Sequence, residues 1–249
     1  MFDENKHYRH EYKYVEPELK LKAAELRISS FMGKDPHAGD KGFYSIRSLY
    51  FDDYFDSFLM ENIDGVDERE KWRIRIYDRD PGFISLERKS RKSDLIAKDS
   101  CRIDEAVFKS IIDGSINVED KNPPLLNVFI TAAKTRALHP TVIVEYERTP
   151  FTAAQGNTRV TFDRNIRSSS ELDALLADRE LMSRPVLETG QNLLEVKFDA
   201  FLPDHIGHAI ETGRMRRETF SKYYLTRKFT FNGTSATGHY VGRLLRVHQ

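Results

Sequence analysis

The stretch Glu70–Tyr77 alternates charged and apolar side chains with a period of two. As a β-strand it places Arg73 and Arg75 on one face and large apolar residues on the other. Two guanidinium groups on neighbouring positions repel each other by about a few kcal/mol at an effective dielectric constant of about 20, unless solvent or a ligand screens them. Because the fork of an arginine matches phosphate oxygens, we expect phosphate on this face.

The same alternation recurs on other strand-like segments, where Glu11 and Lys13, and likewise Glu195 and Lys197, share a face. An antiparallel sheet with one face in water also alternates in this way. Here, however, amphipathic helical segments are available to cover the apolar face, and the opposite face collects both cations and carboxylates. If the strands close into a barrel of about eight, the charged faces line a tunnel that admits one slim ligand.

Unpaired cations in such a tunnel would each cost roughly several kcal/mol. A linear chain of phosphates would compensate them, and a divalent cation would bridge a carboxylate to phosphate oxygens. Glu195 and Glu11 are the carboxylates that we predict for this metal role. An ion pair with neighbouring lysines is the alternative role for both.

The composition excludes several other kinds of chemistry. The 249 residues include 39 Lys and Arg and 39 Asp and Glu, so the formal net charge is zero and any anion site must be a local concentration of cations. We do not expect nucleic acid as a partner, because the sequence indicates no broad basic surface with stacking aromatics. Cys101 is the single cysteine, which excludes an internal disulfide. No P-loop, GxGxxG, CxxC or HExxH motif is present.

The start of the chain is acidic, and no apolar run approaches the ~20 residues that would span a bilayer. We therefore expect a cytoplasmic protein, associated with a membrane only through a membrane-protein partner.

Strands outnumber helices in the predicted order of elements and lie mostly in neighbouring pairs, which favours one α+β domain built on an antiparallel sheet. The turn signal Asp80-Pro81-Gly82 joins two of the strands into a hairpin. We predict strands at Tyr8–Val15, Phe43–Asp52, Lys71–Tyr77, Gly82–Lys89, Ile96–Ile103, Thr141–Arg148, Asn157–Asn165 and Asn192–Asp199. We predict helices at Pro17–Met32, Tyr54–Ile63, Asp104–Ile112, Leu125–Leu138, Ser169–Leu176 and Phe201–Thr212.

An ordered set of short motifs extends from about residue 8 to residue 224. The motifs are Arg9–Tyr14, Tyr50–Asp53, Arg73–Tyr77, Leu86–Lys89, Glu145–Phe151, Arg159–Arg164, Leu194–Lys197 and Ser221–Tyr223. This set resembles the VTC domain, the polyphosphate polymerase branch of the CYTH-like triphosphate tunnel metalloenzymes.

The resemblance implies an eight-stranded antiparallel tunnel barrel with helices packed outside, of the stand-alone kind found in bacterial members. It implies that ATP binds in the tunnel, that its terminal phosphoryl group passes to a growing polyphosphate chain, and that Mn²⁺ or Mg²⁺ is required. Carried over by motif, the phosphate-binding residues are Arg73, Arg75, Lys89, Arg148, Arg159, Lys197 and Lys222, with Glu195 as metal ligand. Arg9, Lys13 and Lys98 are weaker transfers, and Arg9 stands where the wider superfamily has the first of two glutamates.

Two alternatives to the polymerase remain open on the same barrel: a hydrolase that cleaves tripolyphosphate or a nucleoside or RNA triphosphate, and a non-catalytic polyphosphate-binding module. We expect residues 1–224 to form the tunnel domain. Residues 225–249, which contain the basic run Arg243–Arg246, would form a C-terminal tail or a docking element.

Overall fold

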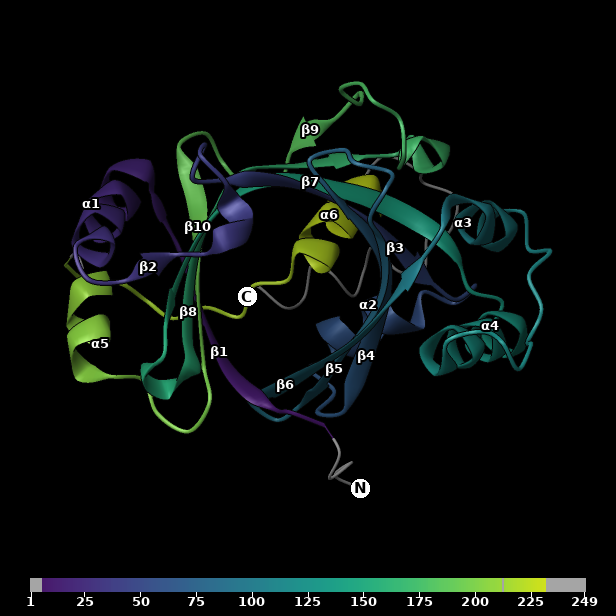
Figure 1. Ribbon diagram of the computed structural model, residues 1–249, viewed down its shortest axis with the longest axis horizontal. Coiled ribbons are helices and arrows are strands. Elements are labelled where there is room, and N and C mark those ends of the chain that lie inside the picture. Colours follow the sequence, from purple (N-terminus) through teal and green to yellow (C-terminus); the bar gives the residue numbers. More distant parts are fainter. Residues whose placement is uncertain (1–5, 212, 232–249) are drawn as a thin grey trace.

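The computed structural model describes residues 6–211 and 213–231. Its centre is a closed antiparallel β-barrel of eight strands, seen as a ring in Figure 1. The hydrogen-bonded order is β7-β3-β4-β5-β6-β1-β10-β8, and β8 pairs again with β7. The barrel strands are β1 (Arg9–Pro17), β3 (Tyr44–Asp52), β4 (Arg69–Tyr77), β5 (Ile84–Lys92), β6 (Leu95–Ile103), β7 (His139–Ala153), β8 (Thr158–Ser169) and β10 (Gln191–Phe198).

Each of the eight predicted strands corresponds to one barrel strand, which confirms the fold class. The structure adds two short strands at the barrel rim, β2 (Gly33–Lys34) on β7 and β9 (Arg184–Pro185) on β8. The predicted helix Ser169–Leu176 is wrong. Strand β8 keeps its pairing with β7 up to Ser169, and only a 3₁₀ turn, η3 (Leu172–Ala174), follows.

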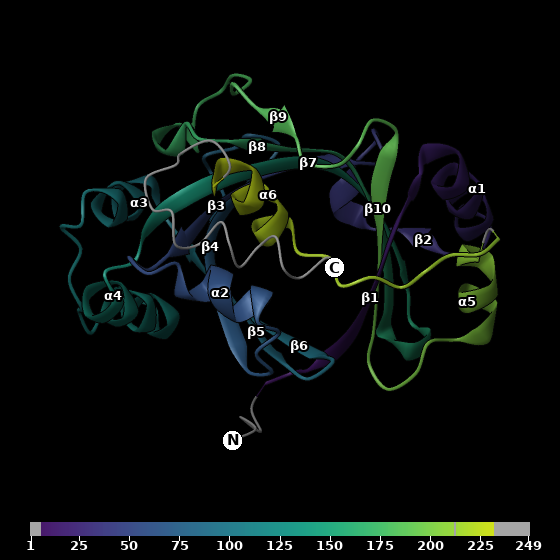
Figure 2. The same cartoon turned by 180° about the vertical axis from the view of Figure 1, so that it is seen from behind.

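The other predicted helices are present, and they pack on the outside of the barrel (Figures 1 and 2). Helices α1 and α5 lie together against β8 and β10, and α3 and α4 lie on the opposite side. The helix bounds are α1 (Glu18–Ser29), α2 (Ser57–Ile63), α3 (Glu105–Ile112), α4 (Pro124–Arg136), α5 (Asp204–Ile210) and α6 (Lys222–Phe231), with 3₁₀ turns η1 (Pro36–Ala38) and η2 (Gln155–Asn157).

Local chemistry explains where several of these elements begin and turn. Asp104 caps α3 by accepting a hydrogen bond from the backbone N–H of Val107 at 2.8 Å. Pro124 occupies the first turn of α4, where its missing N–H has no partner to lose. In the predicted hairpin, the Asp80 carboxylate accepts a hydrogen bond from the N–H of Gly82 at 2.7 Å between β4 and β5.

Helix α6 was not among the predicted helices, and it lies across one end of the barrel (Figure 2). Its Tyr223 ring stacks on Tyr50 with a centroid distance of 5.3 Å. The Tyr223 hydroxyl donates to the buried Asp52, which also accepts from two N–H groups of the first turn of α2. The helix crosses the boundary expected after Tyr224. The basic run Arg243–Arg246 lies outside the described residues.

The barrel is built with its apolar side outward. On β4 the alternate residues Trp72 and Ile74 are buried in the outer core, whereas Arg73 and Arg75 line the lumen. The helices therefore cover the apolar faces of the strands. The charged faces point into the lumen, where they face one another. Across the part of the chain that the structure describes, no helix is both long enough and apolar enough to cross a membrane.

The outer core predicts a clear difference between two neighbouring residues of α4. Phe129 is 1% exposed and packs edge-on against Phe51 and at a tilt against Trp72, so Phe129→Ala should lower the free energy of unfolding by about 3–5 kcal/mol. Val128 is 44% exposed, so Val128→Ala should cost less than about 1 kcal/mol. Urea unfolding of both variants measures the difference, and equal losses would contradict this packing.

Candidate active site

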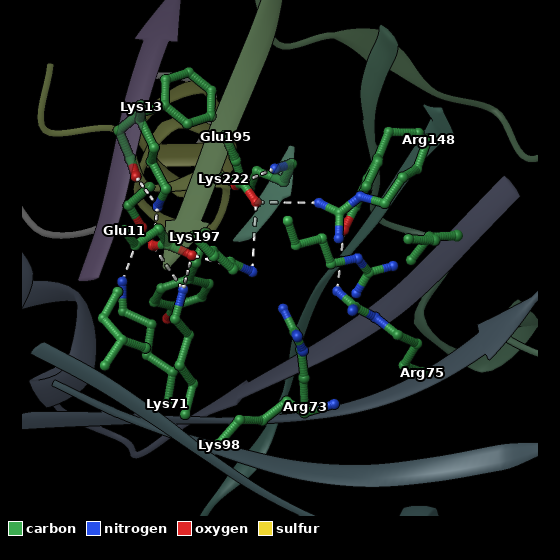
Figure 3. Close-up of a pocket in the computed structure, with 18 of the residues that line it drawn as sticks. Glu11, Lys13, Lys71, Arg73, Arg75, Lys98, Arg148, Glu195, Lys197 and Lys222 are labelled. Atoms are coloured by element: carbon green, nitrogen blue, oxygen red, sulfur yellow. Dashed lines mark hydrogen bonds and ion pairs between the residues drawn. The ribbon is translucent and has the colours of Figure 1, made fainter. Parts of the chain in front are cut away.

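A cavity of about 740 Å³ occupies the barrel lumen. Lysine and arginine outnumber carboxylates in its lining, although the chain as a whole is neutral. Figure 3 shows these side chains converging on the cavity from strands all round it and from α6. Every residue that we predicted as a phosphate or metal ligand lines the cavity: Arg9, Glu11, Lys13, Arg73, Arg75, Lys89, Lys98, Arg148, Arg159, Glu195, Lys197 and Lys222.

Glu11 of β1 is surrounded by lysines from three strands. Its carboxylate lies 2.9 Å from Nζ of Lys13, 3.0 Å from Nζ of Lys89 and 3.3 Å from Nζ of Lys197. Burial raises the pKa of Glu11, but the three ammonium groups outweigh burial, so this pKa lies well below its usual range. Burial also lowers the pKa of Lys89 to about 7, despite the contact with Glu11.

Glu195 of β10 and Asp163 of β8 share two cations. The Arg148 guanidinium donates two hydrogen bonds of 2.6 Å to Asp163 and a third of 3.2 Å to Glu195. Nζ of Lys222 lies 2.6 Å from Asp163 and 3.0 Å from Glu195. Because Lys222 is the first residue of α6, this contact also ties the helix to the lumen. Asp163 is fully buried, so it orients both cations from beneath the cavity.

Glu87 of β5 has the same supporting role on the opposite side of the barrel. Its carboxylate accepts from Nε of Arg73 at 2.7 Å and from Nζ of Lys98 at 3.0 Å, and it lies 3.8 Å from Arg75. Burial raises the pKa of Glu87, but these cations lower it far more, so the carboxylate is charged at neutral pH. Glu87 therefore fixes the direction of the Arg73 guanidinium, which faces the lumen.

Two lumen arginines have hydrogen-bonding capacity left for a ligand. Arg75 donates to two neutral hydroxyls, Ser48 Oγ at 2.9 Å and Tyr146 Oη at 3.1 Å. Arg159 donates through its terminal nitrogen to Asp35 at 2.8 Å, while its buried Nε has no hydrogen-bond partner among the described residues. A buried donor without a partner is rare in proteins.

The weaker transfers occupy different parts of the cavity. Lys13 lies in the centre beside Glu11, and its Nζ also donates to the backbone carbonyl of Phe220 at 2.8 Å. Arg9 lies at the rim, where its Nε donates to Asp199 at 3.0 Å. The guanidinium of Arg9 is thus held by a carboxylate that does not line the cavity.

Sequence reasoning did not select several residues that line the cavity or support its lining. Lys71 has the same strand parity as Arg73 and Arg75, so the alternation contained the signal for it. Glu87 and Asp163 also share faces with predicted ligands, but nothing in the sequence shows that they support other residues. Asp35 reaches the lumen from outside the barrel strands, and its position follows only from the fold.

The two predicted metal ligands lie near each other, because Nζ of Lys197 is 3.3 Å from Glu11 and 3.7 Å from Glu195. Within the described ranges, no group of three or more His, Cys, Asp or Glu could hold a metal ion. Mg²⁺ is commonly held by one or two carboxylates together with substrate phosphates. Glu11 and Glu195 fit a metal that shares its coordination with a phosphate ligand, and they do not fit one held by protein alone.

The closed barrel and its cationic lumen define a protein of the triphosphate tunnel enzyme class. The chain belongs to the VTC domain family, whose model matches residues 8–231. Among solved structures, a candidate adenylyl cyclase from Hippeastrum, described as having a dominant triphosphatase activity, is similar with a TM-score of 0.52 and 13% identity over 89% of this chain and 95% of that chain.

A candidate adenylate cyclase from Bacillus halodurans is similar with a TM-score of 0.47 and 13% identity, over 96% of this chain and 97% of that chain. At these identities the likeness concerns the fold. No curated protein matches the sequence.

The network around Glu87 predicts how stability depends on pH. Because folding lowers the pKa of Glu87, the carboxylate stabilises the fold above its unfolded-state pKa of about 4.3, and this contribution is lost as the pH falls toward the folded-state value. Glu87→Gln should therefore cost about 3–5 kcal/mol at pH 7. The loss of stability between pH 6 and pH 3 should be smaller for this variant than for the wild type, by up to about 1.4 kcal/mol per pH unit.

Urea unfolding across this pH range measures both effects. Glu105→Gln is a suitable control, because Glu105 is half exposed on α3 and pairs only with Lys109 in the described structure. This control should change stability by less than about 0.5 kcal/mol. Parallel acid profiles for the wild type and Glu87→Gln would show that folding does not lower the pKa of Glu87.

Proposed function

We propose that the protein is a divalent-metal-dependent polyphosphate polymerase, which transfers the terminal phosphoryl group of ATP to a growing inorganic polyphosphate chain inside the tunnel. The observation that carries this proposal is the barrel lumen, in which the lysines and arginines that line the cavity from strands all round the barrel outnumber the carboxylates. A surface site for a single phosphate would need only one or two such groups. A row of them matches a linear chain of phosphates.

The proposed phosphate-binding arginines differ in the groups that hold them in place. Arg73 and Arg148 are held by the buried carboxylates Glu87 and Asp163, so their remaining donors have fixed directions. Arg75 has neutral hydrogen-bond partners. Groups fixed in this way stabilise charge that develops during a reaction without having to reorganise.

The residue types suit phosphoryl transfer. A terminal oxygen of the acceptor chain attacks the γ-phosphorus of ATP, the bond from that phosphorus to the β–γ bridging oxygen breaks, ADP leaves, and the chain grows by one phosphate. The transition state is loose, with charge spread over the equatorial oxygens, so positioning and charge neutralisation supply most of the catalysis. No Ser, Cys or His nucleophile is required.

Glu11 and Glu195 would hold the divalent cation, Mn²⁺ or Mg²⁺, together with phosphate oxygens of the substrate. The ion would neutralise the charge that develops on these oxygens. The lysines that now contact the two glutamates, Lys89 and Lys197 among them, would then be available to the phosphate chain.

A triphosphatase is the second candidate. Water in place of the acceptor chain would use the same phosphate-binding residues and release orthophosphate. The triphosphatase activity described for the Hippeastrum protein, which has a similar fold, supports this candidate.

Incubation with ATP and Mn²⁺, followed by electrophoresis and staining for polyphosphate, separates these functions. A ladder of products with stoichiometric ADP supports the polymerase. Orthophosphate without a ladder supports the triphosphatase, and tight binding of polyphosphate without turnover supports a binding module.

We predict that Arg73→Ala and Glu195→Gln each lower turnover by at least about 100-fold, because each removes a charged group that faces the reacting phosphates. Arg88→Ala is the matched control. Arg88 lies on the same hairpin as Arg73 but pairs with Asp99 and covers the Trp72 ring, away from the lumen, so the control should keep turnover within about twofold. Near-normal turnover of folded Arg73→Ala and Glu195→Gln would refute the assigned site.

A further inference from the structure

The two ends of the cavity carry different sets of charged groups. Strand β4 runs from one end of the barrel to the other, so the residues at its start and those in the turn after it lie at opposite ends. Asp78 and Asp80, in that turn, line one end of the cavity. Arg69 and Lys71, at the start of β4, line the other end, together with Arg91 of β5.

At the basic end, like charges face each other directly across the β4–β5 pair. Arg69 lies opposite Arg91, and Lys71 lies opposite Lys89. Directly opposed like charges destabilise a sheet. On β5 each of these cations has a carboxylate nearby, since Lys89 lies 3.0 Å from Glu11 and Arg91 lies 3.7 Å from Asp94. Lys71 on β4 differs from them.

Lys71 has only neutral hydrogen-bond partners in the described structure. Its Nζ donates to Asn62 Oδ1 of α2 at 2.7 Å and to Ser221 Oγ, next to α6, at 2.8 Å. The ammonium group also lies 5.5 Å from the centroid of the Tyr223 ring. All three partners lie at the end of the barrel that α6 covers, and none supplies a negative charge.

The cations Lys13, Lys89, Arg69 and Arg91 all change the pKa of Lys71 in the same direction. Burial lowers the pKa of Lys71 well below its usual value, and the cations Lys13, Lys89, Arg69 and Arg91 lower it further. A positive group that is surrounded by positive groups and by neutral donors and acceptors lacks an anion. A phosphate at this position would contact Lys71 and reduce the repulsion between the opposed pairs.

We propose that Arg69, Lys71 and Arg91 form a second anion subsite at the α6 end of the tunnel, which takes phosphate units of a polyphosphate chain beyond the triphosphate held in the centre. This proposal rests on the proposed function for the identity of its ligand. Lys71 continues the lumen row of Arg73 and Arg75 along β4, so one linear chain can contact all three.

Calorimetric titration of the full chain, without ATP or metal, tests the subsite. Inorganic tripolyphosphate probes the central site alone, and long-chain polyphosphate probes both sites. In Lys71→Met the affinity for long-chain polyphosphate should fall by about tenfold or more, as expected when a charge-assisted hydrogen bond is lost. The affinity for tripolyphosphate should stay within about twofold, which is about 0.4 kcal/mol.

A double variant at the cavity rim, Arg69→Gln with Arg91→Gln, makes the same test without changing a buried residue. It should weaken long-chain binding and leave tripolyphosphate binding within the same limits. Lys109→Met is the control for loss of a lysine, because Lys109 lies on α3 with its side chain 66% exposed. Thermal unfolding shows which variants are folded.

The outcomes are distinct. Equal losses for both ligands would place Lys71 in the central site and overturn a separate subsite, and unchanged affinities in both folded variants would overturn it as well. The assay measures binding without turnover. A wild-type protein that shows the predicted binding difference but makes no polyphosphate would therefore refute the polymerase and leave the subsite standing.

Discussion

The central constraint on this protein is the burial of many cations inside a closed ring of strands. Removing each charge from water costs roughly several kcal/mol unless a partner is present. Glu11, Glu87, Asp163 and Glu195 are these partners, and each is shared by at least two cations. A carboxylate that is shared in this way supports the folded protein in the absence of ligand and still leaves an excess of positive charge for one.

Because charged groups fill the lumen, the apolar packing that stabilises the barrel lies on its outer surface. The helices supply it by packing large apolar residues, such as Phe129 of α4, against the outer faces of the strands. Helix α6 has a second role, since Tyr223 packs on Tyr50 while Lys222 enters the charged network. The apolar layer and the charged lumen are thus two faces of the same strands.

Much of the fold and of the candidate site could be predicted from the sequence, because both depend on a pattern of neighbouring residues. Period-two alternation shows which side chains share a face, so the spacing alone groups Arg73 with Arg75 and Glu195 with Lys197. The helix predicted at Ser169–Leu176 failed because Ser169 still pairs with β7 and the backbone carbonyls of Ala174, Leu175 and Ala177 accept hydrogen bonds from Arg47. Helix α6 was missed because its position depends on contacts with the barrel rather than on its own sequence.

The sequence by itself determined the faces of the strands, the excess of inward-facing cations and the absence of a nucleophilic motif. Only the tertiary structure decided which charges meet across the lumen. The pairing of β7 with β8 sets Arg148 against Asp163, and the return of the chain at α6 brings Lys222 to both acidic residues. The tertiary structure also places Lys71 among neutral groups and other cations. The physical reason is that side-chain period is a local property, whereas barrel closure and register depend on contacts between residues far apart in the chain.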